Sequence, residues 1–417
     1  MFSHKIQNSL KKRYRSEKIF QFSGLLAIAI AVTFLVLLFV AVIYRGAPAF
    51  VAHKIALEVD LKGSLIDIQN LDAANYRQIV KDALKAKFPE AKTATAKANL
   101  YRLLSKIAHL ELKEKVKNNP DLIGKKTVLW FPASSDVDMF LKGKILETTP
   151  SEDRKLKNEQ ITWIKILQNE NAVQGVFNWS FFKYADSAEP EIAGMAASMI
   201  GSILTILVFL AAAFPIAVMA AFYLEEFAPK NTLTDIVEVS INNLAAIPSI
   251  IFGLLGFVVY LNFMHLPRSS AIVGGLTLSM LVLPVIIIAT RNAIKTIPST
   301  IKEAAVAMGA SKTQVMFHHT LPLSLPGIMT GTILAVSRAL GETAPLLMIG
   351  MVAFIADVPQ SFMDPTTVMP VQIYLWSDSP ELGFAEKSAA AIMVLLVFLI
   401  SFNGVAVYIR KKFEKKW

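Results

Sequence analysis

Six long stretches of the chain contain no aspartate, glutamate, lysine or arginine, and they constrain the fold more than any other feature. An α-helix rises about 1.5 Å per residue and the hydrocarbon core of a bilayer is about 30 Å thick, so roughly 20 apolar residues are needed to cross it. The stretches are residues 19–44, 192–224, 239–267, 269–290, 313–337 and 388–409. With a composition that is 54% hydrophobic and 18% charged, they predict an α-helical integral membrane protein with six transmembrane helices.

The third stretch is the least regular of the six. It contains Pro248 and ends in the loop-like sequence "NFMHLP". We therefore expect its helix to cover about residues 240–262, and the next helix to begin near Ser270.

The positive charge of the chain is concentrated at its two ends, which sets the expected orientation. A formal charge of +10 would suit nucleic acid if it were spread over one soluble face. Instead, the basic segments 1–18 and 410–417 flank the first span, 19–45, and the last. Because basic flanks mark the cytoplasmic side, six spans place both termini in the cytoplasm.

A cleavable signal peptide is the alternative interpretation of the first stretch. A basic segment precedes it, and small residues follow it at Gly46–Ala49. The apolar part of a signal peptide has 7 to 15 residues, however, and the stretch 19–44 is far longer. Cleavage would leave the expected topology of the other five spans unchanged.

Residues 46–190 differ from the rest of the chain. They carry 22 lysines and arginines against 18 aspartates and glutamates, mixed along the segment. The amphipathic pattern "NYRQIVKDALKAKF" predicts a helix and "TVLWF" predicts a strand. A length of about 145 residues suits one small α+β domain, which the topology places outside the cytoplasm, before a core of residues 191–409.

The sequence "EAAVAMGASKTQVMFHHTLPLSLPG" (303–327) predicts two short helices joined at a corner, within a cytoplasmic loop at 291–322. Thr300 with Glu303, and Ser311 with Gln314, have the spacing of capping boxes. Gly309 stands where a left-handed helix cap is needed, and we expect the second helix to stop before Pro322. The small residues of the first helix would let another protein approach closely.

Two other interpretations of this element remain open. It could be an amphipathic connector resting on the bilayer surface. It could also be a DNA-binding helix-turn-helix, because Ala305, Gly309 and Val315 have suitable spacing. The flanking spans argue against DNA binding, since they hold the second helix beside the membrane and leave no third helix for a soluble core.

The same residues resemble the EAA loop in permease subunits of ABC importers. Glu303, Ala304, Ala305, Gly309, Leu321 and Pro322 match that pattern, and His319 departs from it, standing where isoleucine or valine is usual. The resemblance implies that this loop inserts into a groove of a separate ATP-hydrolysing subunit. Glu303, Ala304, Ala305 and Gly309 are therefore the expected coupling residues.

The chain is not expected to be an enzyme or to bind a cofactor or metal. "GASKT" at 309–313 lacks the glycine and Gly-Lys-Ser/Thr arrangement of a phosphate-binding loop. There is also no cysteine to supply a thiolate metal site. ATP would be used by the partner subunit.

Two charges lie near the outer end of the fifth span. Arg338 and Glu342 are four residues apart and so would share one helix face. Since a charge in the bilayer is costly, both should face protein or water. Arg338 suits an oxyanion, and Glu342 could pair with it or accept a proton from a protonated phosphate. An ion pair that only locks the bundle is the alternative.

The sequence "SRALGETAPLL" (337–347) is similar to a stretch of phosphate-importer permeases of the PstA type. "AAIPSIIFGLLG" (245–256) resembles another motif of that family and contains Ser249, a weaker candidate for the substrate path. The resemblance covers about residues 190–417, and the inserted segment 46–190 departs from the usual form. Residues 343–356 are too short to cross and would complete the fifth span or dip back outside.

The resemblance implies a permease subunit of an ATP-driven phosphate importer in the inner membrane of a bacterium. The resemblance implies four partners: a second permease of the PstC type, an ATPase dimer of the PstB type, an extracytoplasmic phosphate-binding protein and membrane lipid. Nucleic acid is not expected. The alternatives are the same architecture carrying another oxyanion or solute, and a membrane sensor with an outer ligand-binding domain.

Overall fold

The computed structural model describes residues 2–62, 71–72, 74–150, 152 and 154–413 of the chain. Residues 414–417 of the basic C-terminal segment lie outside this range. The first part of the chain contains α1 (Phe2–Gly46), η1 (Ala47–Phe50), β1 (Val51–Asp60), α2 (Tyr76–Lys87), α3 (Ala94–Tyr101), α4 (Ala108–Asn118), η2 (Pro120–Leu122), β2 (Lys126–Pro132), α5 (Ser135–Leu141), α6 (Asn158–Asn169), β3 (Val173–Phe177) and α7 (Ser180–Lys183).

The remaining elements, of which five have at least 14 residues, are all helical. They are α8 (Ala196–Phe222), η3 (Tyr223–Phe227), α9 (Thr232–Ala245), α10 (Ser249–Gly256), η4 (Phe257–Phe263), α11 (Ala271–Lys295), α12 (Ser299–Ala307), α13 (Lys312–Val315), η5 (Met316–Thr320), α14 (Leu321–Gly341), α15 (Ala344–Met348), α16 (Met369–Ser377) and α17 (Leu382–Phe413). The segments η3, η4 and η5 are π-helical.

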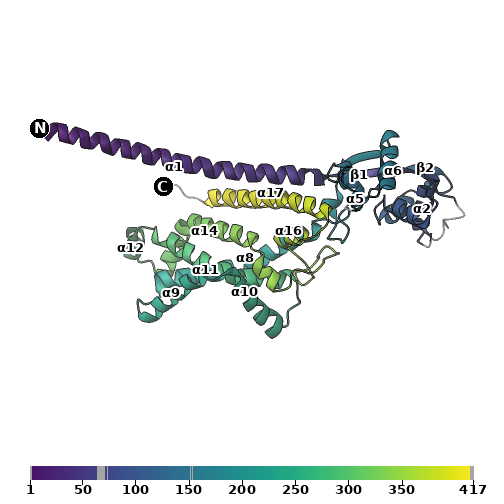
Figure 1. Cartoon of the computed structure of the whole chain (residues 1–417). Helices are drawn as coiled ribbons and strands as arrows, with labels where there is room; N and C mark the ends of the chain where they lie inside the picture. The colour runs from purple at the N-terminus through teal and green to yellow at the C-terminus, as the bar shows by residue number, and fades with distance from the viewer. Residues whose placement is uncertain (1, 63–70, 73, 151, 153, 414–417) are drawn as a thin grey trace.

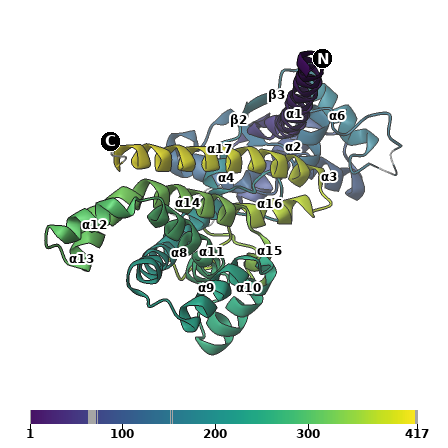
Figure 2. The ribbon, with the colours of Figure 1, turned by 90° about the vertical axis from the view of Figure 1, so that its left-hand side faces the viewer.

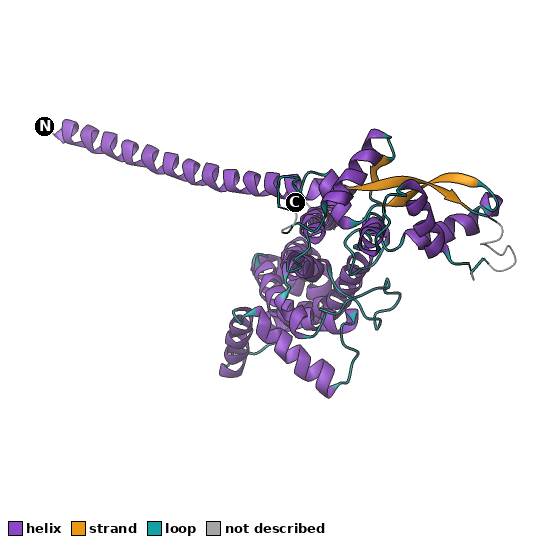
Figure 3. Ribbon diagram, turned by 45° about the vertical axis from the view of Figure 1, so that its right-hand side comes forward, coloured by secondary structure: helices purple, strands orange, loops and turns teal. Residues whose placement is uncertain are grey.

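The molecule has a helical bundle and an inserted domain at opposite ends, as Figure 1 shows. The two chain ends and α12 lie toward one side of that view, and the inserted domain lies toward the other. Figure 2 shows α8, α11 and α14 close together below α17. The strands are confined to the inserted domain (Figure 3).

The inserted domain is built on a three-stranded antiparallel sheet with the order β2-β1-β3. Ile55, Leu57 and Val59 alternate along β1 and are almost completely buried on one face. Apolar residues of α2, α4 and α6 cover that face and form one core with it. The helix predicted at "NYRQIVKDALKAKF" and the strand predicted at "TVLWF" are confirmed as α2 and β2.

The bundle core forms where α8, α11 and α14 pack closely. A Cβ atom added to Gly275 of α11 would lie 2.5 Å from Val208 Cβ of α8. One added to Gly331 of α14 would lie 2.2 Å from Ala289 Cβ of α11. Small residues let neighbouring helices in a membrane approach each other, which explains why these positions are glycine. In contrast, the central window of α1 is not buried against the rest of the chain.

Five helical segments are long and apolar enough to cross a membrane, and a sixth exists only if α9 and α10 are counted as one. The single helix predicted over 240–262 is wrong, because α9 and α10 meet at a bend of 101°. Pro248 follows the break, and a proline lacks the amide hydrogen of a helix and disfavours helical backbone in the residue before it.

Long helices extend into both ends of segment 291–322, which is predicted to be the cytoplasmic coupling loop. Helix α11 continues to Lys295, and α13, η5 and α14 form one continuous helical segment, Lys312–Gly341. The prediction that the second short helix stops before Pro322 is therefore wrong. Pro322 lies in the first turn of α14 directly after the π-helical segment η5, where the change in hydrogen-bond register accommodates a residue without an amide hydrogen.

Candidate functional site

The corner between α12 and α13 has the geometry that its glycine and serine predict. Gly309 has a φ of +88°, the left-handed conformation that glycine adopts without strain. The Ala310 amide donates to the Ala305 carbonyl, and the Gly309 amide donates to the Val306 carbonyl, which closes a Schellman cap. The Ser311–Gln314 capping box is present. The Thr300–Glu303 box is absent, because Pro298 already occupies the cap position of α12.

The outward face of α12 carries Glu303 among mainly apolar residues. Met308 is 89% exposed and Val306 is 54% exposed, while Glu303 and Ala304 are also exposed. Ala305 is buried and faces inward. The structure therefore leaves Glu303, Ala304 and the Gly309 corner accessible to another protein, whereas Ala305 belongs to the internal packing of the element.

A charge cluster lies beneath this element, and the sequence analysis did not identify it. Arg291 of α11 has a side chain that is 10% exposed, and its Nε lies 2.5 Å from Glu225 Oε1 in η3. Arg291 Nη2 also lies 2.5 Å from Glu238 Oε1 in α9. The cluster thus joins three spans at the α12 end of the bundle. The adjacent glutamates directly after the second apolar stretch were the available signal for it.

Arg338 and Glu342 form the predicted pair, although not on one helix face. Their Nε and Oε1 atoms are 3.8 Å apart, and α14 ends at Gly341, so Glu342 is the first residue beyond the helix. The Arg338 side chain is 49% exposed. Leu334, one turn earlier, is also exposed. This face of α14 is not covered by the chain itself, and the guanidinium can reach a ligand or another subunit.

Ser249 is the first residue of α10 and is half-buried after the Pro248 break. Among the described residues it forms no hydrogen bond or ion pair with Arg338 or Glu342. The structure therefore does not join the three predicted path residues into one contact network.

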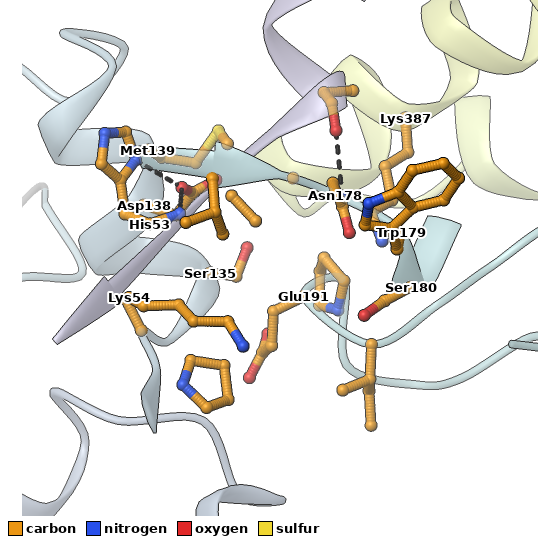
Figure 4. Close-up of a pocket in the computed structure, with 18 of the residues that line it drawn as sticks. His53, Lys54, Ser135, Asp138, Met139, Asn178, Trp179, Ser180, Glu191 and Lys387 are labelled. Carbon is orange, nitrogen blue, oxygen red and sulfur yellow. Dashed lines mark hydrogen bonds and ion pairs between the residues drawn. The ribbon is translucent and has the colours of Figure 1, made fainter. Parts of the chain in front are cut away.

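A polar site lies where the inserted domain meets α17. A cavity of about 470 Å³ lies between them, and Figure 4 shows Lys54, Ser135 and Glu191 facing into it. On its wall, Lys142 Nζ lies 2.6 Å from Glu386 Oε1 and 2.7 Å from Asp138 Oδ2. The side chains of Lys142 and Glu386 are 8% and 5% exposed. A buried ion pair thus connects α17 to the residue that follows α5.

The electrostatics of this cavity differ from one carboxylate to the next. Burial alone would raise the pKa of Asp138, but a hydrogen bond with His53, 2.8 Å away, and the charge of Lys142 outweigh it and keep that pKa below its ordinary value. Burial raises the pKa of Glu191. One oxygen each of Glu191 and Glu386 is buried without a hydrogen-bond partner within the described part of the chain. No cluster of metal-ligating side chains was found among the described residues.

Sequence reasoning missed this network because its members are far apart in the chain. His53 and Asp138 are 85 residues apart, and Lys142 and Glu386 are 244 residues apart. A charged pair, Glu386 and Lys387, at the start of the last apolar stretch was the one local signal.

Two family models match the chain. Residues 213–415 match the binding-protein-dependent transport system inner membrane component, and residues 7–151 match a domain of unknown function, DUF3333. The second match covers most of α1 and much of the inserted domain.

Several curated proteins are similar to the chain over more than half of its length. The phosphate transport system permease protein PstA of Yersinia pestis is 28% identical over 257 residues, which are 60% of this chain and 85% of that protein. PstA of Haemophilus influenzae is 29% identical over 235 residues, covering 56% and 81%. The probable ABC transporter permease YqgI of Bacillus subtilis is 27% identical, covering 56% and 85%.

Among solved structures, the inward-facing MetNI methionine ABC transporter aligns with a TM-score of 0.40 at 19% identity. The alignment covers 52% of this chain and 94% of that chain.

Proposed function

We propose, from the premise that this chain is an ABC transporter permease built on the inner membrane component domain of binding-protein-dependent systems, that its substrate is inorganic phosphate. A permease is a transport component and not an enzyme. The observation that carries the choice of substrate is Arg338, half-exposed at the end of α14 and paired with Glu342 at 3.8 Å, in a stretch similar to phosphate permeases.

The two side chains suit a protonated oxyanion. A guanidinium presents a planar set of donors that binds two oxygens of a phosphate at once. A separation of 3.8 Å is a charge contact and longer than a hydrogen bond, so phosphate can enter without breaking a close pair. Glu342 would then accept a hydrogen bond from the P–OH group, which fully ionised sulfate lacks. Ser249, after the break at Pro248, is a secondary candidate for the path.

ABC permeases work with a second permease, an ATPase and a substrate-binding protein. For this chain we propose a PstC-type permease, a PstB-type ATPase dimer and an extracytoplasmic phosphate-binding protein. The ATPase would dock on α12 at Glu303, Ala304 and the Gly309 corner. Exposed Met308 and Val306 supply the apolar contact area that such docking needs.

The chain is a multi-pass membrane protein, and we propose that both termini and α12 are cytoplasmic. The basic segments at the two ends favour this orientation. The grouping of both chain ends and α12 on one side of the molecule supports it (Figure 1). Residues 46–190 then form an extracytoplasmic domain, residues 19–45 the first span, and residues 191–409 the permease core.

The test is uptake of labelled phosphate into proteoliposomes that hold the assembled complex, with ATP on the ATPase side. We expect ATP-dependent uptake, and we expect Arg338→Ala to abolish it while the complex still assembles. Lys at this position would retain charge without the planar fork and should give intermediate uptake. Import of a different solute would retain the architecture and refute the substrate, and ligand binding without any uptake would favour a sensor.

A further inference from the structure

Two adjacent glutamates at the end of α8 contact two different parts of the bundle. Glu225 binds Arg291 on α11, as described above. Glu226 Oε1 lies 2.5 Å from Lys302 Nζ on α12. Both glutamates belong to the π-helical segment η3, which continues α8 without a break. The end of one span therefore holds α11 through one carboxylate and α12 through the next.

Helix α12 has few other connections to the spans. It packs mainly against α13 and η5, the segments that follow it in the chain. Among the described residues, Lys302–Glu226 is the ion pair that joins α12 to a span. The side chains of Lys302 and Glu226 are 27% and 18% exposed, so water screens this pair less than it would an exposed one.

The apolar contacts below this pair are arranged around α11 and α14. Phe222, Ile294 and Ile328 form a small buried cluster, with Met316 and Leu321 packed against it. This cluster supports the continuous segment from α13 to α14. The segments that follow the Gly309 corner are therefore held by apolar packing, whereas α12, which precedes the corner, is held by the ion pair of Lys302.

We propose that Lys302 and Glu226 are positioning residues that carry a displacement of α12 into α8. The pair fixes the end of α8 to α12, and the contact of Glu225 with Arg291 passes the displacement on to α11. This inference rests on the proposed function, because it assumes that an ATPase moves α12. It adds a route from α12 to the spans that does not run along the chain through the Gly309 corner.

The first experiment measures phosphate imported per ATP hydrolysed in the assembled complex. Lys302→Met keeps the apolar stem and removes the charge, and we expect import per ATP to fall at least about fivefold while ATP hydrolysis continues. The double variant Lys302→Glu with Glu226→Lys reverses the pair and should restore coupling. Lys230→Met is the matched control, since Lys230 is an exposed lysine in the loop after η3.

A structural role alone would lower the amount of assembled complex and leave the ratio of import to hydrolysis unchanged. Wild-type coupling in Lys302→Met would overturn the inference. The inference would also be overturned if the double variant, Lys302→Glu with Glu226→Lys, assembled normally but did not couple ATP hydrolysis to import.

The second experiment does not depend on the substrate. The chain has no cysteine, so spin labels can be placed at Thr300→Cys on α12 and Met219→Cys on α8, both of which are exposed and lie outside the proposed ATPase contact. We expect the distance between the labels to stay constant through the ATP cycle in the parent chain and to change in Lys302→Met. A distance that behaves alike in both would refute the linkage. If the parent complex imports no phosphate, the proposed function fails, and this measurement still decides the inference.

Discussion

The buried pair between Lys142 and Glu386 should determine how firmly the inserted domain is attached to α17. Lys142 contacts two carboxylates, Asp138 at 2.7 Å and Glu386 at 2.6 Å, so Lys142→Met would leave both without their cation. Removing one partner of a buried pair typically costs about 3–5 kcal/mol. Because His53 still contacts Asp138, we expect the lower end, about 3 kcal/mol.

Removing the charge of Glu386 should destabilise the interface less than removing that of Lys142. In Glu386→Gln, Lys142 keeps Asp138 as a partner and gains an amide oxygen, so a loss of about 1 kcal/mol is expected. The double variant should lose less than the sum of the two, since the single changes remove the same contact. The difference from additivity gives the coupling energy of the pair.

Hydrogen exchange of the purified full chain is the suitable assay. A loss of about 3 kcal/mol in the opening free energy corresponds to roughly 100-fold faster exchange. The effect should appear in α5 and in the first turns of α17. Lys165→Met is the matched control, because Lys165 pairs with Glu147 on the surface, with both side chains at least half exposed, and should change exchange by less than about threefold. If Lys142→Met accelerates exchange no more than Lys165→Met does, the pair does not hold the interface.

Three further predictions concern other parts of the molecule. Gly309→Ala forces a residue with a Cβ atom into φ +88°, which should cost about 1–2 kcal/mol at the corner. Gly309→Ala and Glu303→Ala should each weaken binding of the ATPase in a pull-down. Unchanged binding and coupling would argue against docking at α12. Glu191→Gln should raise the melting temperature at pH 7, since a carboxyl whose folded pKa is raised destabilises the fold when ionised. That gain should shrink as the pH falls through the raised pKa toward the ordinary value of about 4.3, and an equal gain at pH 4 would refute the assignment. Gly331→Leu should abolish the close contact of α14 with Ala289 and lower the melting temperature, whereas Gly341→Leu, where nothing lies within 4 Å of an added Cβ, should change it much less.

The accuracy of the sequence predictions depended on how local each feature was. The Gly309 turn and the Ser311–Gln314 box were predicted correctly, because both depend on neighbours within a few residues. The cap at Thr300 was wrong although its spacing was suitable, since the cap position of α12 falls on Pro298, two residues earlier. Spacing identifies residues that could cap a helix, and the backbone around them selects one.

The hydrophobic stretches predicted where the long helices lie in the chain, but not where a helix bends or by what angle. Transfer of apolar side chains out of water depends on composition along about 20 residues, so five of the six stretches yielded helices long enough to cross. The bend of 101° between α9 and α10 was not predictable from composition. Pro248 marks where a helix can break, but it does not specify the angle.

The sequence by itself determined the long apolar helices, the inserted segment of mixed charge and the glycine corner, because each of those features arises from short-range preferences. The tertiary structure alone decided which charges meet. Lys142 reaches Glu386 across 244 positions, and Lys302 reaches Glu226 across 76. A charge gains a partner only where packing brings the two side chains to within a few ångströms and excludes water. That condition depends on how whole elements dock, and no local pattern along the chain specifies it.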